Sequence, residues 1–147
     1  MNQDNRSNNI CLKERLIELP KIEDPRGNLS FIEELNQIPF KVNRVYWIYD
    51  VPGGQFRGGH AFKQQHELIV ALSGSFDVTL DDGSSKRKYF LNRSYYGLYV
   101  PNKIWRSLEN FSTNSLCLIL ASTHYYEKDY MREYHEFLSF IAKQSVK

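Results

Sequence analysis

Short runs of alternating apolar and polar residues recur along most of the chain, from residue 13 to about residue 122. Turn-forming clusters separate the runs: Asp24–Gly27 precedes the run Asn28–Glu33, and Val51–Gly54 follows the run Asn43–Asp50. Alternation with a period of two is typical of β-strands that have one buried face. Several short strands at near-regular spacing predict an all-β sandwich or barrel.

Other runs have the same β-prone composition. They are Leu16–Leu19, Leu68–Leu80, Lys86–Leu91, Tyr95–Val100, Ile104–Glu109 and Ser115–Ala121. Gly74 interrupts the longest of them and predicts a bend between two strands. The sequence Asp81-Asp82-Gly83 predicts the turn of a β-hairpin.

The hydrophobic period changes near the C-terminus. Five apolar residues recur there at i, i+4, i+7, i+8 and i+11: Tyr130, Tyr134, Phe137, Leu138 and Ile141. This spacing predicts an amphipathic helix over about 127–144 that packs on the barrel or on a partner. We interpret its aromatic stripe as core packing and not as part of a ligand site.

The chain begins with a polar stretch over residues 2–9, which predicts a solvated tail over 1–12 ahead of a single domain over 13–147. No apolar run reaches the roughly 18–20 residues that a membrane span needs, and residues 1–9 have no apolar segment typical of a signal peptide. Cys117 lies in an apolar run and is interpreted as a buried free thiol, which fits a reducing cytoplasm.

Composition excludes one class of partner and leaves another open. A length of 147 residues suits one domain, and 19 Lys and Arg against 17 Asp and Glu give a net charge of only +2. This balance excludes a nucleic-acid binder driven by a broad basic surface. Aromatic residues make up 14% of the chain, which suits both β-strands and ligand pockets.

The segment Gly53–Gly74 combines a glycine-rich turn with two histidines. In a continuous strand, His60, Phe62 and His66 share the parity of Leu68, whose side chain is expected to face the core. Polar groups at one end of an apolar barrel interior form a pocket. If the strand is continuous, His60 and His66 point into the same pocket; the alternatives for His66 are the dry end of the strand or an outward position across a bulge.

A second segment places a cation on an apolar face. Arg106 shares its parity with Ile104 and Leu108, so its side chain is expected to point inward. A guanidinium on the buried side of a strand needs an anion or a carboxylate as its partner.

These segments resemble the two motifs of the cupins, which implies a cupin barrel of the double-stranded β-helix or jelly-roll type with the C-terminal helix added. The matching positions are Gly54, His60, Glu67, Gly74, Pro101 and Asn110. Phe62 and Arg106 stand where the motifs have metal-binding histidines, so we expect no cupin metal site. One metal alternative remains, a set of His60, His66 and Glu67, although Glu67 has the opposite strand parity.

The resemblance narrows to the sugar-nucleotide 3,4-ketoisomerases, cupins that act on dTDP-4-keto-6-deoxyglucose. It covers residues 16–142 and rests on the strings RGGHAFK, LSGSFDVTLDDG, YYGLYVPNKIW and LASTHYYEKDYMREYHEF. It implies a cytoplasmic isomerase of bacterial surface-glycan synthesis (O-antigen or lipopolysaccharide) that moves a keto group from C4 to C3 through an enediolate. Neither a metal nor a redox cofactor is implied. Family members dimerise, and Leu16–Leu19 is a candidate strand for the interface.

The same resemblance suggests roles for individual residues. His60 is the candidate base, because an imidazole has a pKa near 6.5, and His66 is a candidate second imidazole. The side chains for diphosphate and sugar oxygens are Arg26, Arg44, Arg57 and Arg106, although a surface salt bridge is an equal alternative for Arg26. Tyr46 and Tyr99 are candidates for contacts with the nucleotide or the sugar. Phe62, where the family commonly has a second histidine, is either an apolar wall for the sugar or core.

Two other functions remain open on this basis. The RGxH string also resembles the dTDP-4-keto-sugar 3,5-epimerases, in which this histidine is the base. The loss of the second imidazole at Phe62 is also compatible with a non-catalytic cupin that binds a nucleotide sugar.

Overall fold

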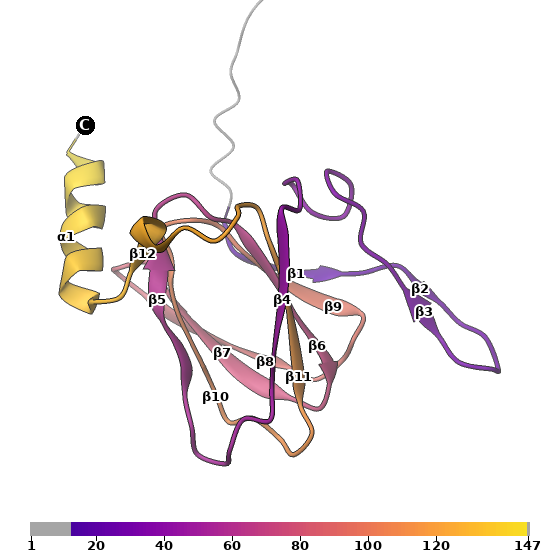
Figure 1. The fold of residues 1–147 in the computed structure, drawn as a ribbon. Helices are drawn as coiled ribbons and strands as arrows, with labels where there is room; N and C mark the ends of the chain where they lie inside the picture. The colour runs from indigo at the N-terminus through magenta and orange to yellow at the C-terminus, as the bar shows by residue number, and fades with distance from the viewer. Residues whose placement is uncertain (1–12, 147) are drawn as a thin grey trace, which may run out of the picture.

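Two five-stranded antiparallel β-sheets face each other in this computed structural model, which describes residues 13–146 (Figure 1). The predicted tail 1–12 lies outside the described residues. In the first sheet, the order is β1 (Arg15–Glu18), β9 (Tyr96–Val100), β6 (Glu67–Ser73), β11 (Leu116–Ala121) and β4 (Arg44–Tyr49). In the second, it is β12 (Tyr130–Met131), β5 (Arg57–Phe62), β10 (Trp105–Glu109), β7 (Phe76–Asp81) and β8 (Lys86–Leu91).

This arrangement confirms the prediction of an all-β fold with a C-terminal helix. Two of the predicted turns, at Gly74 and Gly83, have a clear structural role. Gly74 has a φ of +68° between β6 and β7, and a Cβ atom there would lie 2.8 Å from Cα of Ser115. Because a side chain fits neither this backbone conformation nor this space, glycine is required at the bend. Gly83 has a φ of +97° in the turn of the β7–β8 hairpin, as the Asp-Asp-Gly signal predicts.

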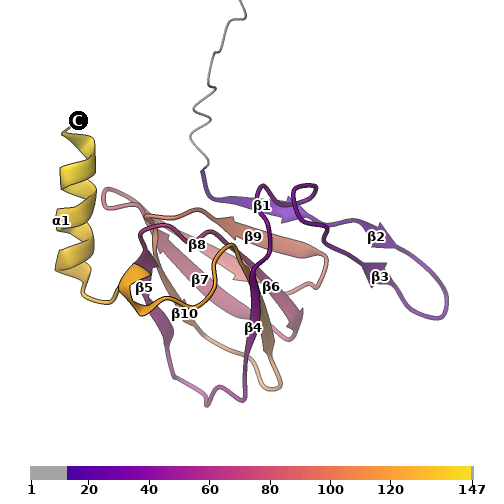
Figure 2. The same ribbon diagram turned by 45° about the horizontal axis from the view of Figure 1, so that its top comes forward.

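A small hairpin projects from the body of the molecule. It consists of β2 (Lys21–Ile22) and β3 (Leu29–Ser30), and Figure 2 shows it extending away from both sheets. The predicted strand Asn28–Glu33 is reduced to the two residues of β3. The predicted strand Leu16–Leu19 forms β1, which pairs with β9 of the same chain.

The apolar core lies between the two sheets, and a second apolar layer covers the outer face of the first sheet. Ile69 and Ala71 of β6 face the inner core, whereas Leu68 and Val70 pack outward against Ile38 and neighbouring residues of the N-terminal segment. Because both faces of β6 are buried, its sequence is a near-continuous apolar run and its inward parity is not evident from the pattern.

The expectation of one continuous strand from His60 to Leu72 is therefore wrong. The strand β5 ends at Phe62, a turn follows, and β6 begins at Glu67. The buried carboxylate of Asp129 holds this turn: it accepts hydrogen bonds from the backbone N–H groups of Gln64, at 2.8 Å, and Gln65, at 3.1 Å. The interruption reverses the parity, so that Glu67 points inward and His66 points outward.

The C-terminal helix is shorter than predicted. A short 3₁₀ helix η1 spans Glu127–Asp129, β12 follows, and the helix α1 covers only Tyr134–Ser145. Phe137 is buried against β5 and β12, so the prediction that the stripe packs on the barrel is confirmed for α1. The assignment of Tyr130 to that stripe is wrong, because Tyr130 is extended and pairs with Phe62 in β12.

Two further predictions, on membrane-spanning segments and on the thiol of Cys117, concern residues that the structure describes. No helix within residues 13–146 combines the length and the hydropathy that crossing a membrane requires. Cys117 is a buried free thiol between the sheets, as predicted.

Candidate active site

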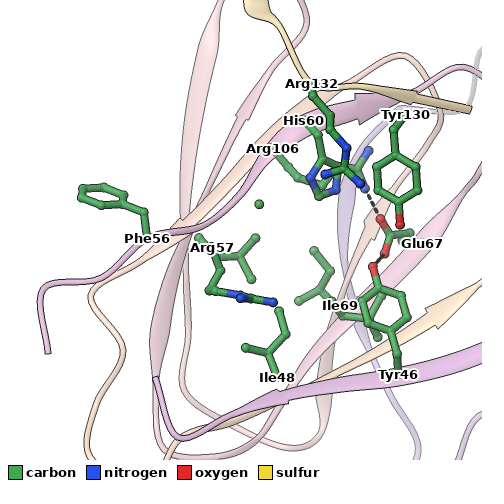
Figure 3. Close-up of a pocket in the computed structure, with 13 residues that line it drawn as sticks. Tyr46, Ile48, Phe56, Arg57, His60, Glu67, Ile69, Arg106, Tyr130 and Arg132 are labelled. Atoms are coloured by element: carbon green, nitrogen blue, oxygen red, sulfur yellow. Dashed lines mark hydrogen bonds and ion pairs between the residues drawn. The ribbon is translucent and has the colours of Figure 1, made fainter. Parts of the chain in front are cut away.

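A cavity of about 360 Å³ opens between the two sheets (Figure 3). Its apolar lining includes Ile48, Ile69, Leu108 and Ile119. Polar and charged side chains of the lining come from β4, β5, β6, β10 and the segment that follows η1. An apolar chamber with a few convergent polar groups is the usual form of a small-molecule site.

His60 is the only imidazole that lines this cavity among residues 13–146. Gly58 and Gly59, which precede it, both have positive φ angles, and a Cβ atom on Gly58 would lie 3.1 Å from the carbonyl oxygen of Arg106. The glycines therefore allow β5 to approach β10 closely, and the bulged pairing of these strands places His60 opposite Arg106.

Burial, together with the positive charges of Arg106, Arg132 and Arg57, lowers the pKa of His60 to about 3. The free imidazole is therefore neutral at physiological pH. A neutral imidazole has one ring nitrogen with a free lone pair, which is the form of histidine that can act as a general base.

Arg106, Glu67 and Tyr46 form a buried polar cluster beside His60. The guanidinium of Arg106 donates to Oε1 of Glu67 at 2.7 Å and to the carbonyl oxygen of Ile104 at 2.9 Å. The hydroxyl of Tyr46 donates to the other carboxylate oxygen of Glu67. Both members of the ion pair are almost fully buried, so the prediction that Arg106 needs a carboxylate is confirmed.

The same cluster keeps Tyr46 protonated. Burial and the neighbouring Glu67 carboxylate raise the pKa of the Tyr46 hydroxyl far above its usual value. This phenol is therefore a neutral hydrogen-bond donor and acceptor at the cavity wall.

Phe62 lies behind the cavity wall. Its ring is fully buried, packs against Tyr130 at a centroid distance of 4.5 Å and lies 4.9 Å from the guanidinium carbon of Arg106. Between the two interpretations of Phe62, the structure favours core packing, and the expectation that it forms a wall in contact with the sugar is not supported. Its ring fills the space beneath Arg106 and His60.

Three ionisable side chains of the lining, those of Glu67, Tyr130 and Arg132, are absent from the substrate site predicted from the sequence. Glu67 was placed on the wrong strand parity, although the unpaired charge expected at Arg106 and the glutamate of the cupin motif both pointed to it. Tyr130 was placed on the helix stripe, and Arg132 had no assigned role. Both enter the cavity because Asp129 is anchored to the turn after β5, a contact between distant segments that no local pattern reveals.

The histidine expected as a second imidazole lies outside the cavity. Nδ1 of His66 is 2.7 Å from the hydroxyl oxygen of Tyr99, and both rings lie in the outer apolar layer near Phe40. The expectations that His66 faces the pocket and that Tyr99 contacts a ligand there are therefore wrong. They fail because the interruption after β5 turns His66 away, while Tyr99 on β9 faces the outer layer.

Two of the predicted arginines also lie apart from the cavity lining. Arg26 is exposed in the projecting hairpin and pairs with Asp24 at 2.9 Å, which is the surface salt bridge weighed as its alternative. Arg44 donates to the side chain of Gln65 at 2.9 Å and lies over the ring of Tyr46. The predicted residues that do line the cavity are His60, Tyr46, Arg57 and Arg106.

The alternative metal set is not assembled. His66 faces away from His60 and Glu67, and within residues 13–146 no group of three His, Cys, Asp or Glu side chains has a metal-binding arrangement.

Comparisons with known proteins show which family and which enzymes this chain resembles. A family model described as FdtA: WxcM-like, C-terminal, matches residues 12–142. A TDP-4-oxo-6-deoxy-alpha-D-glucose-3,4-oxoisomerase from Aneurinibacillus thermoaerophilus is 41% identical over 132 residues, which are 90% of this chain and 95% of that protein.

Solved structures of 3,4-ketoisomerases are also similar to this chain. A 3,4-ketoisomerase from Helicobacter canadensis is 36% identical with a TM-score of 0.85, over 88% of this chain and 97% of that one. A mutant of the 3,4-ketoisomerase QdtA from Thermoanaerobacterium thermosaccharolyticum, in complex with TDP-4-keto-6-deoxyglucose, is 32% identical with a TM-score of 0.88, over 92% and 98%. A dTDP-4-dehydrorhamnose 3,5-epimerase from Bacillus anthracis is 17% identical over 80% and 76%, with a TM-score of 0.71, and shares the fold alone.

Proposed function

The chain belongs to the FdtA, WxcM-like C-terminal family, and on this premise we propose that it is a 3,4-ketoisomerase of a dTDP-4-keto-6-deoxyhexose. The observation that carries the proposal is the neutral, buried imidazole of His60 at a cavity that also holds the guanidinium of Arg106. Relatives with at least 30% identity include enzymes named for this reaction. The 3,5-epimerase is much more distant.

The proposed reaction is a proton transfer that leaves the oxidation state of the sugar nucleotide unchanged. His60 removes the proton from C3, which the adjacent C4 ketone acidifies. The C–H electron pair forms the C3–C4 double bond, and the negative charge develops on O4. The proton on O3 then passes to O4, and C4 takes up a proton, which gives the C3 ketone and the C4 hydroxyl with no net change in protons. General base catalysis of this kind typically contributes about 10²–10⁴-fold to the rate.

Arg106 supplies the positive charge near the enediolate. Its guanidinium is fixed by Glu67 and by the carbonyl oxygen of Ile104 before a substrate binds. A preorganised cation in a site that excludes water stabilises a developing oxyanion strongly. The phenol of Tyr46 is held by Glu67 at the same wall and is a candidate carrier for the proton that moves between O3 and O4.

The charge of the lining favours an anionic substrate. Three arginines line the cavity, Arg57, Arg106 and Arg132, against the single carboxylate of Glu67. Guanidinium groups bind phosphates through paired hydrogen bonds. A sugar attached to a nucleoside diphosphate therefore matches the site, with the sugar at His60 and Arg106 and the diphosphate towards the remaining guanidinium groups.

We further propose that the enzyme is a homodimer that provides nucleotide sugars for a bacterial surface glycan such as O-antigen or lipopolysaccharide, and that it works in the cytoplasm. The projecting hairpin supports the dimer, because Ile22 and Leu29, which pair across it, are each 55% exposed. Apolar side chains that protrude together in this way are typical of an interface between subunits. The free thiol of Cys117 suits a reducing compartment.

The experiment is to incubate the protein with dTDP-4-keto-6-deoxyglucose in deuterated water and to identify the product by NMR. A 3-keto product that a 3-aminotransferase can trap supports the proposal. Deuterium at C5 indicates an epimerase instead. Binding of dTDP without any exchange or product indicates a non-catalytic binding protein, and either of the last two outcomes overturns the proposal.

A further inference from the structure

Arg132 and Glu127 form an ion pair at the edge of the cavity. The guanidinium of Arg132 binds the two oxygens of the Glu127 carboxylate, with Nε 2.8 Å from one oxygen and an Nη atom 3.1 Å from the other. The same guanidinium lies 4.3 Å from the centre of the Tyr130 ring. Figure 3 shows Arg132 beside His60 in the cavity lining.

This pair differs from an ordinary surface salt bridge in its position. Arg132 lines the cavity, whereas Glu127 is not part of the lining. Both side chains are more than half exposed, so neither is locked by packing, and an exposed pair of this kind contributes little to stability. A carboxylate that binds a guanidinium through two oxygens has the geometry with which a phosphate group binds it.

A second exposed arginine of the cavity lining has no such partner. Arg57 is exposed, lines the same cavity, and forms no salt bridge with an acidic side chain of residues 13–146. Of the two exposed guanidinium groups in the lining, that of Arg57 is free for an anion, and that of Arg132 holds an exposed carboxylate in the place of an anion.

We propose that Arg132 binds the diphosphate of the substrate, and that Glu127 occupies its guanidinium only until the diphosphate displaces it. The inference rests on the proposed function and adds to it a further specificity-determining residue and a competing group built into the chain. When the diphosphate binds, it takes over the paired hydrogen bonds of Arg132, and Glu127 turns to solvent together with its hydrogen bond from Tyr125.

The test is a calorimetric titration of dTDP into four proteins: wild type, Arg132→Gln, Glu127→Gln and the control Lys128→Gln. Lys128 is exposed on η1, next to the pair, so its substitution reports the general effect of removing one nearby charge. Thymidine, which has no phosphate, is titrated into the same proteins. Thermal unfolding of each variant verifies that it is folded.

We expect Arg132→Gln to weaken dTDP binding by roughly 10- to 100-fold, because a bidentate charged contact is lost. Glu127→Gln should strengthen it by about two- to five-fold, because the competing carboxylate is gone. Lys128→Gln should change the affinity by less than about two-fold. Thymidine affinity should be equal in all four proteins.

The sign of the Glu127 effect separates the proposal from a structural role. If the ion pair only supports the local fold, both substitutions weaken dTDP binding, and the proposal is overturned. It is also overturned if Arg132→Gln binds dTDP as tightly as the wild type. A wild-type protein that turns over the keto sugar while Arg132→Gln retains full dTDP affinity refutes this inference alone. A folded wild-type protein that does not bind dTDP refutes the proposed function as well.

Discussion

The imidazole of His60 lies edge-on to the ring of Phe62, with centroids 4.9 Å apart and planes inclined by 77°. Phe62, where the family resemblance implies a second histidine, is thus a buried aromatic ring that supports His60. Because His66 faces away, the cavity of residues 13–146 contains a single imidazole. The proposed mechanism therefore assigns the carbon-to-carbon proton transfer to His60 without a second histidine.

Phe62→Leu should leave the chemistry nearly intact, because it removes packing and no group that transfers a proton. We expect the turnover rate to remain within about ten-fold of the wild type and the free energy of unfolding to fall by about 1–2 kcal/mol. Steady-state kinetics and urea unfolding measure the two quantities. A folded variant that turns over at least about 100-fold more slowly contradicts the supporting role of Phe62.

The pH profile of kcat/KM reports the pKa values of groups in the free enzyme. It should therefore show no loss of activity below about pH 6.5 of the kind that protonation of an ordinary histidine causes. The pKa of His60 is about 3 in the free protein, so the imidazole is already deprotonated at pH 5 and gains no further basic form as the pH rises. We therefore expect kcat/KM to be nearly constant from about pH 5 to about pH 8, after correction for the substrate. A fall in kcat/KM towards acidic pH that follows a pKa near 6.5, the ordinary value for histidine, speaks against this environment of the base.

The buried pair of Glu67 and Arg106 should show strong coupling in a double-mutant cycle. Glu67→Gln or Arg106→Met alone leaves an unmatched buried charge and is expected to cost about 3–5 kcal/mol of unfolding free energy. The double variant should cost clearly less than the sum of the two, because it contains no unpaired charge. Urea unfolding of the four proteins gives the coupling energy. Additive losses would mean that the two side chains do not depend on each other.

His66→Phe and Tyr99→Phe form a matched pair that tests the outer layer. Each removes one side of the hydrogen bond between Nδ1 of His66 and the Tyr99 hydroxyl. We expect each to lower the unfolding free energy by about 0.5–1.5 kcal/mol and to leave the turnover rate within about three-fold of the wild type. If His66→Phe turns over at least about 100-fold more slowly while Tyr99→Phe keeps the wild-type rate, His66 belongs to the catalytic site after all.

The parts of the fold that follow from local patterns could be predicted from the sequence. The hairpin at Asp81–Gly83, the bend at Gly74 and the buried cation at Arg106 all depend on residues close together in the chain. The inward-facing side of β6 could not be predicted, because both of its faces are buried and the alternation is lost. The partner of Arg106 could therefore be predicted as an anion or a carboxylate, but not as Glu67.

Tyr130 and Arg132 could not be predicted at the cavity for a different reason. The spacing of Tyr130 continues the apolar stripe of the helix, yet the buried carboxylate of Asp129 binds backbone N–H groups more than 60 residues away in sequence. This tertiary contact holds the chain extended, so Tyr130 pairs with Phe62 and lies at the cavity. Helical periodicity gives no information about such a contact.

The role of His60 as the base is the central claim, and His60→Asn tests it most directly. The measurement is an NMR time course with dTDP-4-keto-6-deoxyglucose for wild type and variant, with dTDP affinity measured on both proteins. We predict that the wild type forms the 3-keto product, and that His60→Asn forms it about 10²–10⁴-fold more slowly while dTDP affinity changes by less than about three-fold. A variant that binds dTDP normally and turns over within about ten-fold of the wild type would contradict this role.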